Sequence, residues 1–222
     1  MSTHHLLVVA NQFDETVGGL EIHLQELLPR LVDRGLCVTL VYLGSQSPRE
    51  WRGVEVVPMR RRLDFRAIMA LPDPRDVGPL WRRLRAGGLA AGPVTIMATH
   101  TRFFPMSWLG LRWARRLGVP LLHTEHGGGP VATRPRLVAE LSNAVDRTLG
   151  RAVLRGADRV LAVSRAGAAF VEDLAGFEPH ILGNGIRLQD WLPDDPTAPL
   201  PAERPLVFAG RFIREKGWAD FL

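Results

Sequence analysis

Short apolar runs alternate with segments of helical periodicity along most of this chain, and this alternation limits the fold more than any other feature. Each run is as long as a strand and continuously apolar, which is typical of a parallel strand buried on both faces. Segments of helical period separate the runs, as crossover connections require. The predicted strands span residues 6–10, 38–43, 54–57, 94–98, 119–122 and 159–163. The sequence therefore predicts an α/β fold with a parallel sheet and helices on both faces.

The segments between the strands predict the helices. Leucines recur at helical spacing after Gly18 and Gly19, and Gly35 is the predicted C-terminal cap of this helix. Ser164 is a predicted N-cap. Residues 60–92 are rich in Arg, Pro and Gly, and we expect one or two helices there. Further helices are predicted at residues 106–117, 135–155 and 164–175.

A stretch rich in proline and aspartate, residues 192–201, has the composition of an exposed linker. An apolar run and a glycine-flanked turn follow it. We therefore predict an N-terminal domain that is followed by the beginning of a second one. The predicted parts are residues 1–192 for the N-terminal domain, 193–205 for the linker and 206–222 for the truncated start of a second domain.

The charge of the chain favours anionic partners. Lys and Arg total 28 against 23 Asp and Glu, for a formal net charge of +5. Such a balance suits nucleic acid, an anionic membrane surface or a phosphorylated substrate. The arginines come in short clusters without the interleaved aromatic residues of a single-strand binding groove, which argues against nucleic acid. A solvated helix face is the alternative explanation for these clusters.

Cysteine usage and the apolar runs suggest where the protein works. Cys37 is the only cysteine, so no internal disulfide can form, and a reducing compartment fits. The N-terminus lacks the basic region of a signal peptide, and no apolar run reaches the length of a membrane span. We expect a cytoplasmic protein that is at most peripheral to the inner face of the membrane.

Gly18 and Gly19 lie in the first strand-to-helix turn. Glycine allows close approach of the backbone to a ligand, and a helix N-terminus favours an anion. We therefore predict a phosphate-binding loop here, with a tight turn that needs glycine for geometry alone as the alternative. The residues around this turn lack the Gly-x-Gly-x-x-Gly spacing of a nicotinamide site.

Two histidines lie at the carboxyl ends of neighbouring predicted strands, His100 and His123. Open α/β sheets bind ligands at this edge, so both are site candidates, together with Thr124 and Glu125. His123, Glu125 and His126 could supply metal ligands, but a strand-end loop lacks the helical partner of the usual zinc motifs, and we expect no metal. A hydrogen bond from His123 to a substrate hydroxyl or phosphate is favoured. The alternative is a bond to a nearby backbone carbonyl.

Lys216 is the only lysine, and it shares a glycine-flanked turn with Arg211. The turn follows an apolar run and precedes what reads as a starting helix. Two cations and backbone N–H groups would then point to one place, which predicts a diphosphate site.

Taken in order, these segments resemble a family 4 glycosyltransferase of GT-B architecture, in which two Rossmann-like domains face each other across the active site. The resemblance covers nearly the whole chain. It is carried by Gly18-Gly19-Leu20-Glu21, Leu31-Val32-Asp33-Arg34-Gly35, His100-Thr101, His123-Thr124, Ala157-Asp158-Arg159-Val160, Val163-Ser164, Asn184-Gly185-Ile186 and Gly210-Arg211 with Lys216-Gly217.

The resemblance implies transfer of a sugar from a nucleotide-diphosphate sugar to a sugar or lipid-linked acceptor, with retention and without a metal. It implies that Arg211 and Lys216 hold the donor diphosphate, that Gly18 and Gly19 approach phosphates or acceptor, and that His123 is catalytic at the reacting sugar. The family's paired glutamates have no counterpart here. We therefore expect the chain alone to be an incomplete or inactive fragment. The alternative is a non-catalytic acceptor-binding or interaction module that needs a partner for the second domain.

Overall fold

The computed structural model describes residues 4–13, 18–44, 50–65, 69–130, 136–190, 207–209 and 218. The chain divides into two compact units, Met1–Gly185 and Ile186–Leu222. The second unit contains a short 3-10 helix, Leu188–Asp190. The domain boundary predicted near residue 192 stays a prediction, because residues 191–206 lie outside the described part.

The first unit is built on an eight-stranded sheet with the strand order β10-β9-β8-β7-β1-β2-β4-β3. All described pairings in this sheet are parallel except the edge pair β3–β4. This confirms the predicted α/β fold. The strands are β1 (His5–Val9), β2 (Cys37–Leu43), β3 (Glu50–Trp51), β4 (Val54–Met59), β7 (Ile96–His100), β8 (Leu121–Glu125), β9 (Arg159–Ala162) and β10 (His180–Ile181).

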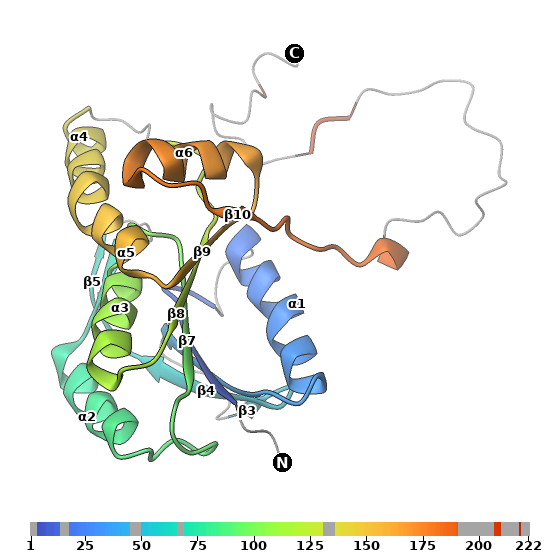
Figure 1. The fold of residues 1–222 in the computed structure, drawn as a ribbon, viewed down its shortest axis with the longest axis vertical. Helices are drawn as coiled ribbons and strands as arrows, with labels where there is room; N and C mark the ends of the chain where they lie inside the picture. Colours follow the sequence, from blue (N-terminus) through green and yellow to red (C-terminus); the bar gives the residue numbers. More distant parts are fainter. Residues whose placement is uncertain are drawn as a thin grey trace, which may run out of the picture. The chain divides into compact units, whose positions relative to one another are not determined.

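Helices cover both faces of this sheet, with α1 on one side and α2, α3 and α5 on the other (Figure 1). The predicted helix at residues 135–155 is present, although a π-helical turn, Asp146–Gly150, interrupts its hydrogen-bond pattern. The helices are α1 (Gly19–Asp33), α2 (Pro74–Arg85), α3 (Pro105–Leu117), α4 (Arg136–Val145), α5 (Arg151–Gly156) and α6 (Arg165–Ala175).

Strand pleating divides the core into two layers, as alternate side chains of β1 show. Leu7 and Val9 pack on the face covered by α2, α3 and α5, in a cluster that contains the buried Trp113. Leu6 and Val8 pack with Leu24 and other residues of α1 on the opposite face. Because both faces are covered, the strands are apolar throughout, which is the pattern seen in the sequence.

Local signals set several helix ends. The Ser164 hydroxyl accepts a hydrogen bond from the Gly167 N–H at 3.0 Å, which confirms the predicted N-cap of α6. Asp73 caps α2 in the same way, through the Arg75 N–H at 2.9 Å. Gly176 ends α6 in the left-handed conformation, where a side chain would add strain.

Residues 60–92 were expected to hold one or two helices, and they hold α2 together with a separate antiparallel hairpin of β5 (Arg61–Phe65) and β6 (Met69–Pro72). The helix predicted to follow Lys216 lies outside the described residues apart from Trp218. Among the described helices, none is both long and apolar enough to cross a bilayer.

The order of the strands fixes where a ligand can bind. Strand β1 lies between β7 and β2, so the connections after β1 and after β7 run toward opposite edges of the sheet. A crevice forms outside the carboxyl ends of two such strands, and open α/β sheets bind their ligands there. The candidate site therefore lies beyond the ends of β1, β7 and β8.

Candidate active site at the carboxyl edge of the sheet

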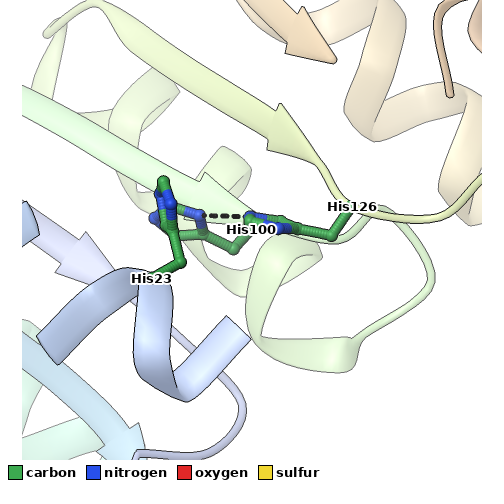
Figure 2. A group of neighbouring side chains, drawn as sticks. All are labelled: His23, His100 and His126. Carbon is green, nitrogen blue, oxygen red and sulfur yellow. Dashed lines mark hydrogen bonds between the residues drawn. The ribbon is translucent and has the colours of Figure 1, made fainter. Parts of the chain in front are cut away.

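Three histidines from separate elements meet at this edge. His23 lies on the first turns of α1, His100 is the last residue of β7, and His126 follows the end of β8. Figure 2 shows the three rings pointing toward one another. The sequence singled out His100 as a site candidate and His126 only as a possible metal ligand that was not favoured, whereas His23 was not a candidate.

The three rings are in direct contact. Their centroids lie 5.7 Å apart for His23 and His100, 5.0 Å for His23 and His126, and 5.5 Å for His100 and His126. His100 Nδ1 lies 3.2 Å from His126 Nε2, so one of these nitrogens donates a hydrogen to the other. The Asn184 side chain hydrogen-bonds His23, which connects the Asn184-Gly185-Ile186 motif to the site.

Burial keeps these imidazoles neutral at physiological pH. Desolvation, with the neighbouring imidazoles, holds the pKa of His100 well below its ordinary value. Desolvation and the nearby His23 lower the pKa of His126 to about 4, although Glu125 acts in the opposite direction. The pKa of His23 is lowered by desolvation, against the effect of its bond to Asn184. A neutral imidazole can accept a proton, donate a hydrogen bond or bind a metal.

His123 lies behind this group and is fully buried. Its Nδ1 is hydrogen-bonded to the Thr99 hydroxyl at 2.9 Å, and its Nε2 lies 3.6 Å from Glu125 Oε2. In the parallel register, His123 pairs with Thr99 and Thr124 with His100, so pleating places His100 and His123 on opposite faces of the sheet. The catalytic role predicted for His123 stays a prediction.

A buried arginine holds two carboxylates beneath the histidines. Arg102 Nη1 lies 2.9 Å from Glu125 Oε1, and Arg102 Nη2 lies 2.8 Å from Asp146 Oδ2. All three side chains are almost completely buried. The guanidinium also lies over the Phe170 ring, 4.2 Å from its centroid. This network connects the turn after β7, the end of β8 and the π-helical turn. The sequence identified Glu125 as a candidate but did not identify the network.

The pKa values of the two carboxylates are shifted in opposite directions. Desolvation raises the pKa of Glu125, but His123, Arg102 and the Gly127 N–H favour the ionised form more strongly and bring the pKa to about 2. For Asp146, desolvation prevails over the attraction of Arg102, and its pKa is raised. Glu125 therefore carries the firm negative charge of the network.

The glycine run after β8 is shaped by this network. The Gly127 N–H donates to Glu125 Oε1 at 2.6 Å. A Cβ at Gly127 would come within 2.9 Å of both Glu125 Oε1 and Arg102 Nη1, so a side chain here would displace the ion pair. Glycine is therefore needed at this position, directly after His126, because the backbone passes close to buried charged groups.

Backbone strain marks the neighbouring turn. Thr101 has a φ of 61°, an unfavourable value for a β-branched residue. The Ser107 hydroxyl holds the turn through the carbonyls of His100 and Thr101, at 2.8 and 2.9 Å. Strain of this kind occurs at functional sites, where the surrounding contacts maintain it.

The first helix begins at the predicted glycine turn. Gly18 is the N-cap of α1, and the Glu21 side chain folds back against it, close enough to overlap with any side chain at this position. Gly19 has open space where a Cβ would lie. A carboxylate of the chain itself therefore lies at this helix N-terminus. The ligand role predicted for Gly18 and Gly19 stays a prediction.

One further polar group lies just beyond β1. Asn11 is fully buried, and within the residues that the structure describes neither atom of its amide has a hydrogen-bond partner. Such a group costs free energy unless something satisfies it. Its position after β1 places it at the same sheet edge as the histidines.

The remaining predicted site residues divide into two sets. Thr124 and Glu125 are buried at the end of β8, and only Glu125 belongs to the charged network. Arg211 and Lys216 lie outside the described residues, and the diphosphate site predicted for them stays a prediction.

Comparison with known proteins gives consistent results. An uncharacterised glycosyltransferase of Methanocaldococcus jannaschii is 27% identical over 173 residues, which cover 75% of this chain and 43% of that protein. The D-inositol 3-phosphate glycosyltransferase of Kribbella flavida is 25% identical over 193 residues, covering 82% of this chain and 45% of that protein. The chain thus spans less than half the length of these two relatives.

Structural comparison supports the same fold. The crystal structure of Anabaena HepE in complex with UDP has a TM-score of 0.55 and 13% identity, and it covers 84% of this chain and 45% of HepE. The predicted architecture, the N-terminal half of a GT-B glycosyltransferase, is confirmed. The sequence also matches the glycosyltransferase family 4 over residues 17–190, most of its 222 residues. The predicted resemblance is therefore confirmed: this chain belongs to glycosyltransferase family 4.

Proposed function

We propose that this chain provides the acceptor-side half of the active site of a glycosyltransferase that uses a nucleotide-diphosphate sugar and retains the anomeric configuration. One observation carries the proposal. The family match over residues 17–190 coincides with a polar site at the sheet edge where α/β proteins bind ligands. HepE was solved with UDP, which supports a nucleotide-sugar donor for this chain as well.

The histidines would act on the acceptor and the transferred sugar. The half-buried rings of His23 and His126 can contact sugar hydroxyls, and as neutral imidazoles they can donate or accept hydrogen bonds. His123 is fully buried, so its proposed effect on the reacting sugar is a positioning one. Its Nε2 lies 3.6 Å from Glu125 Oε2, and Glu125 is bonded to the loop that carries His126 through the Gly127 N–H.

The donor diphosphate would be bound by Arg211 and Lys216. Departure of the nucleoside diphosphate leaves negative charge on the leaving oxygen, and fixed cations stabilise that charge. This part of the proposal depends on the resemblance and on residue type, since both residues lie outside the described part of the chain. The acceptor is proposed as a sugar or lipid-linked sugar.

Transfer of labelled sugar tests the proposal. A panel of nucleotide-diphosphate sugars is incubated with sugar and lipid-linked acceptors. Two proteins are assayed, the 222-residue chain and the full product of the gene that encodes it. We expect His123→Ala to lower kcat more than it weakens donor affinity, and Lys216→Ala to weaken donor binding. His180→Ala, an exposed change on β10, should leave both unchanged. Absence of transfer with every donor would reject the proposal.

A non-catalytic, acceptor-binding module is the second candidate. It is favoured by the coverage of 43% and 45% of the two relatives, since a partner would then supply the other half of the site. Saturation-transfer NMR distinguishes the two. Binding of a sugar acceptor with no transfer in either form of the protein would favour the module.

A further inference from the structure

The arrangement of His23, His100 and His126 resembles a metal site more than a simple hydrogen-bonded pair. The candidate ligand nitrogens of the three residues all lie within 4.8 Å of one another. We propose that these three histidines bind one divalent transition-metal ion, with Zn²⁺ as the ion that fits best. The site shares His23 and His126 with the proposed acceptor site, but the metal proposal depends on the geometry of the histidines and needs neither transferase activity nor the residues assigned to the donor diphosphate.

The distances suit the ion. Zinc–nitrogen bonds of about 2.0–2.1 Å in tetrahedral geometry place two ligand nitrogens about 3.4 Å apart. His100 Nδ1 and His126 Nε2 are separated by 3.2 Å, close to that value. His23 faces both rings from α1, so a small rotation of its half-buried side chain completes a three-nitrogen site (Figure 2).

The chemistry of the donors selects the metal class. Neutral imidazole binds zinc, copper and nickel well, whereas magnesium and calcium require oxygen ligands. Three protein ligands leave one tetrahedral position for water or for a substrate oxygen. The ligand set therefore has the composition of an open zinc site.

The surroundings hold the ligands in place. Metal-binding histidines usually have a second hydrogen-bond partner that orients the ring, and Asn184 provides one for His23. His100 is fixed at the end of a buried strand. Glu125, next to His126 in the chain, is held by Arg102 and by the Gly127 N–H, and these contacts fix the backbone on both sides of His126.

The proposal differs from the expectation drawn from the sequence, which was no metal. That expectation considered His123 and His126 as a pair, and the structure separates them, because His123 is bonded to Thr99 in the core. His126 meets His23 and His100 instead, which are 77 residues apart in the sequence. Only the fold brings these ligands together.

Metal titration of the purified 222-residue chain, stripped with a chelator, tests the proposal. We expect one Zn²⁺ per chain by competition with a chromogenic chelator, and a visible absorption band of tetrahedral Co²⁺. His23→Ala and His126→Ala should each weaken Zn²⁺ binding by at least about a hundredfold, since loss of a ligand costs no less than loss of an outer partner. His180→Ala is the matched control and should bind as the unmodified chain does.

Imidazole NMR signals provide a second measurement that needs no variant. Zinc should shift the ring signals of His23, His100 and His126 and leave those of His5 and His180 in place. His5 is a suitable reference because its ring is hydrogen-bonded to Thr39 and Gly92 inside the core. The proposal is overturned if zinc does not bind, if His126→Ala binds it equally well, or if zinc shifts a different set of histidines.

Discussion

The guanidinium of Arg102 lies 2.8 Å from the carboxylate of Asp146, and this contact connects the turn after β7 to a π-helical turn 44 residues later. The same guanidinium is paired with Glu125 at the end of β8. The turn that follows His100 and the loop that carries His126 are therefore supported by one buried cation. The chain depends on Arg102 for the positions of groups that lie far apart in its sequence.

Replacing Arg102 with Met should destabilise the protein strongly. The change leaves Glu125 and Asp146 buried without a counter-ion, which typically costs about 3–5 kcal/mol. Urea unfolding followed by circular dichroism measures the loss. Arg82→Met, an exposed change on α2, is the control and should stay within about 0.5 kcal/mol. A loss below about 1 kcal/mol for Arg102→Met would contradict this account of the network.

Gly110→Ala should destabilise the protein although alanine favours helix. A Cβ at Gly110 would overlap with the Thr99 methyl group and touch Val9, because α3 lies directly on the sheet there. Overpacking of this kind costs about 1–3 kcal/mol. Gly19→Ala at the start of α1 is the control: its Cβ would meet nothing within 4 Å, so the change should be neutral or stabilise by up to about 1 kcal/mol. Equal melting temperatures for the two variants would contradict the prediction.

Asp76 should show a pH-dependent contribution to stability. A hydrogen bond from the Arg60 side chain, 2.7 Å long, lowers the pKa of Asp76 below its ordinary value of 3.8, while partial burial acts in the opposite direction. A pKa that is lower in the folded state stabilises above the unfolded value, and this stabilisation disappears as the pH falls below 3.8. Asp76→Asn should therefore unfold more easily than the unmodified chain at neutral pH.

The difference between the two proteins should shrink toward about pH 3, where the carboxylate becomes protonated in the unfolded chain. Urea midpoints at several pH values measure it. Asp173→Asn, at an exposed position on α6, controls for the loss of one negative charge. A difference between Asp76→Asn and the unmodified chain that does not change with pH would mean that the Arg60 pair contributes nothing.

The arrangement of strands and helices was largely predictable, because burial on both faces leaves a continuous apolar run in the sequence. The strands at residues 6–10, 38–43 and 159–163 were found for this reason. The β5–β6 hairpin was not found, since three of the five residues of β5 are charged and the short apolar run of β6 lies in a segment rich in Arg, Pro and Gly. The apolar pattern that identified the strands of the large sheet is therefore not clear in this two-stranded hairpin.

The sequence predicted that the site lies at the carboxyl edge of the sheet, but it did not predict which side chains meet there. His100 ends β7 as expected, whereas His123 lies inside β8 and not at its end, and the sequence alone could not give the register that places them on opposite faces. His23 carried no motif of its own, because its role depends on where α1 begins and on which strand neighbours β1. The four-residue spacing from Gly19 to His23, which keeps both on one helix face, was the signal that could have identified it.

The strongest link between stability and function is expected at Asn11. Its amide is buried without a partner among the described residues, which typically costs about 1–3 kcal/mol. Asn11→Leu keeps a similar volume and removes the unsatisfied polar atoms. The free energy of unfolding should therefore stay the same or rise by about 1 kcal/mol, whereas sugar-acceptor binding should weaken if the amide serves a ligand.

Ser107→Ala provides the opposite case, because the Ser107 hydroxyl is bonded to the carbonyls of His100 and Thr101. Its removal should cost about 1–2 kcal/mol, since it leaves buried carbonyl groups with fewer partners. Urea unfolding and saturation-transfer NMR with a sugar acceptor are measured on both variants. If Asn11→Leu loses as much stability as Ser107→Ala, the Asn11 amide has a structural partner and is not kept for a ligand. If Asn11→Leu keeps its stability and loses acceptor binding, the buried amide is satisfied by hydrogen bonds to the acceptor.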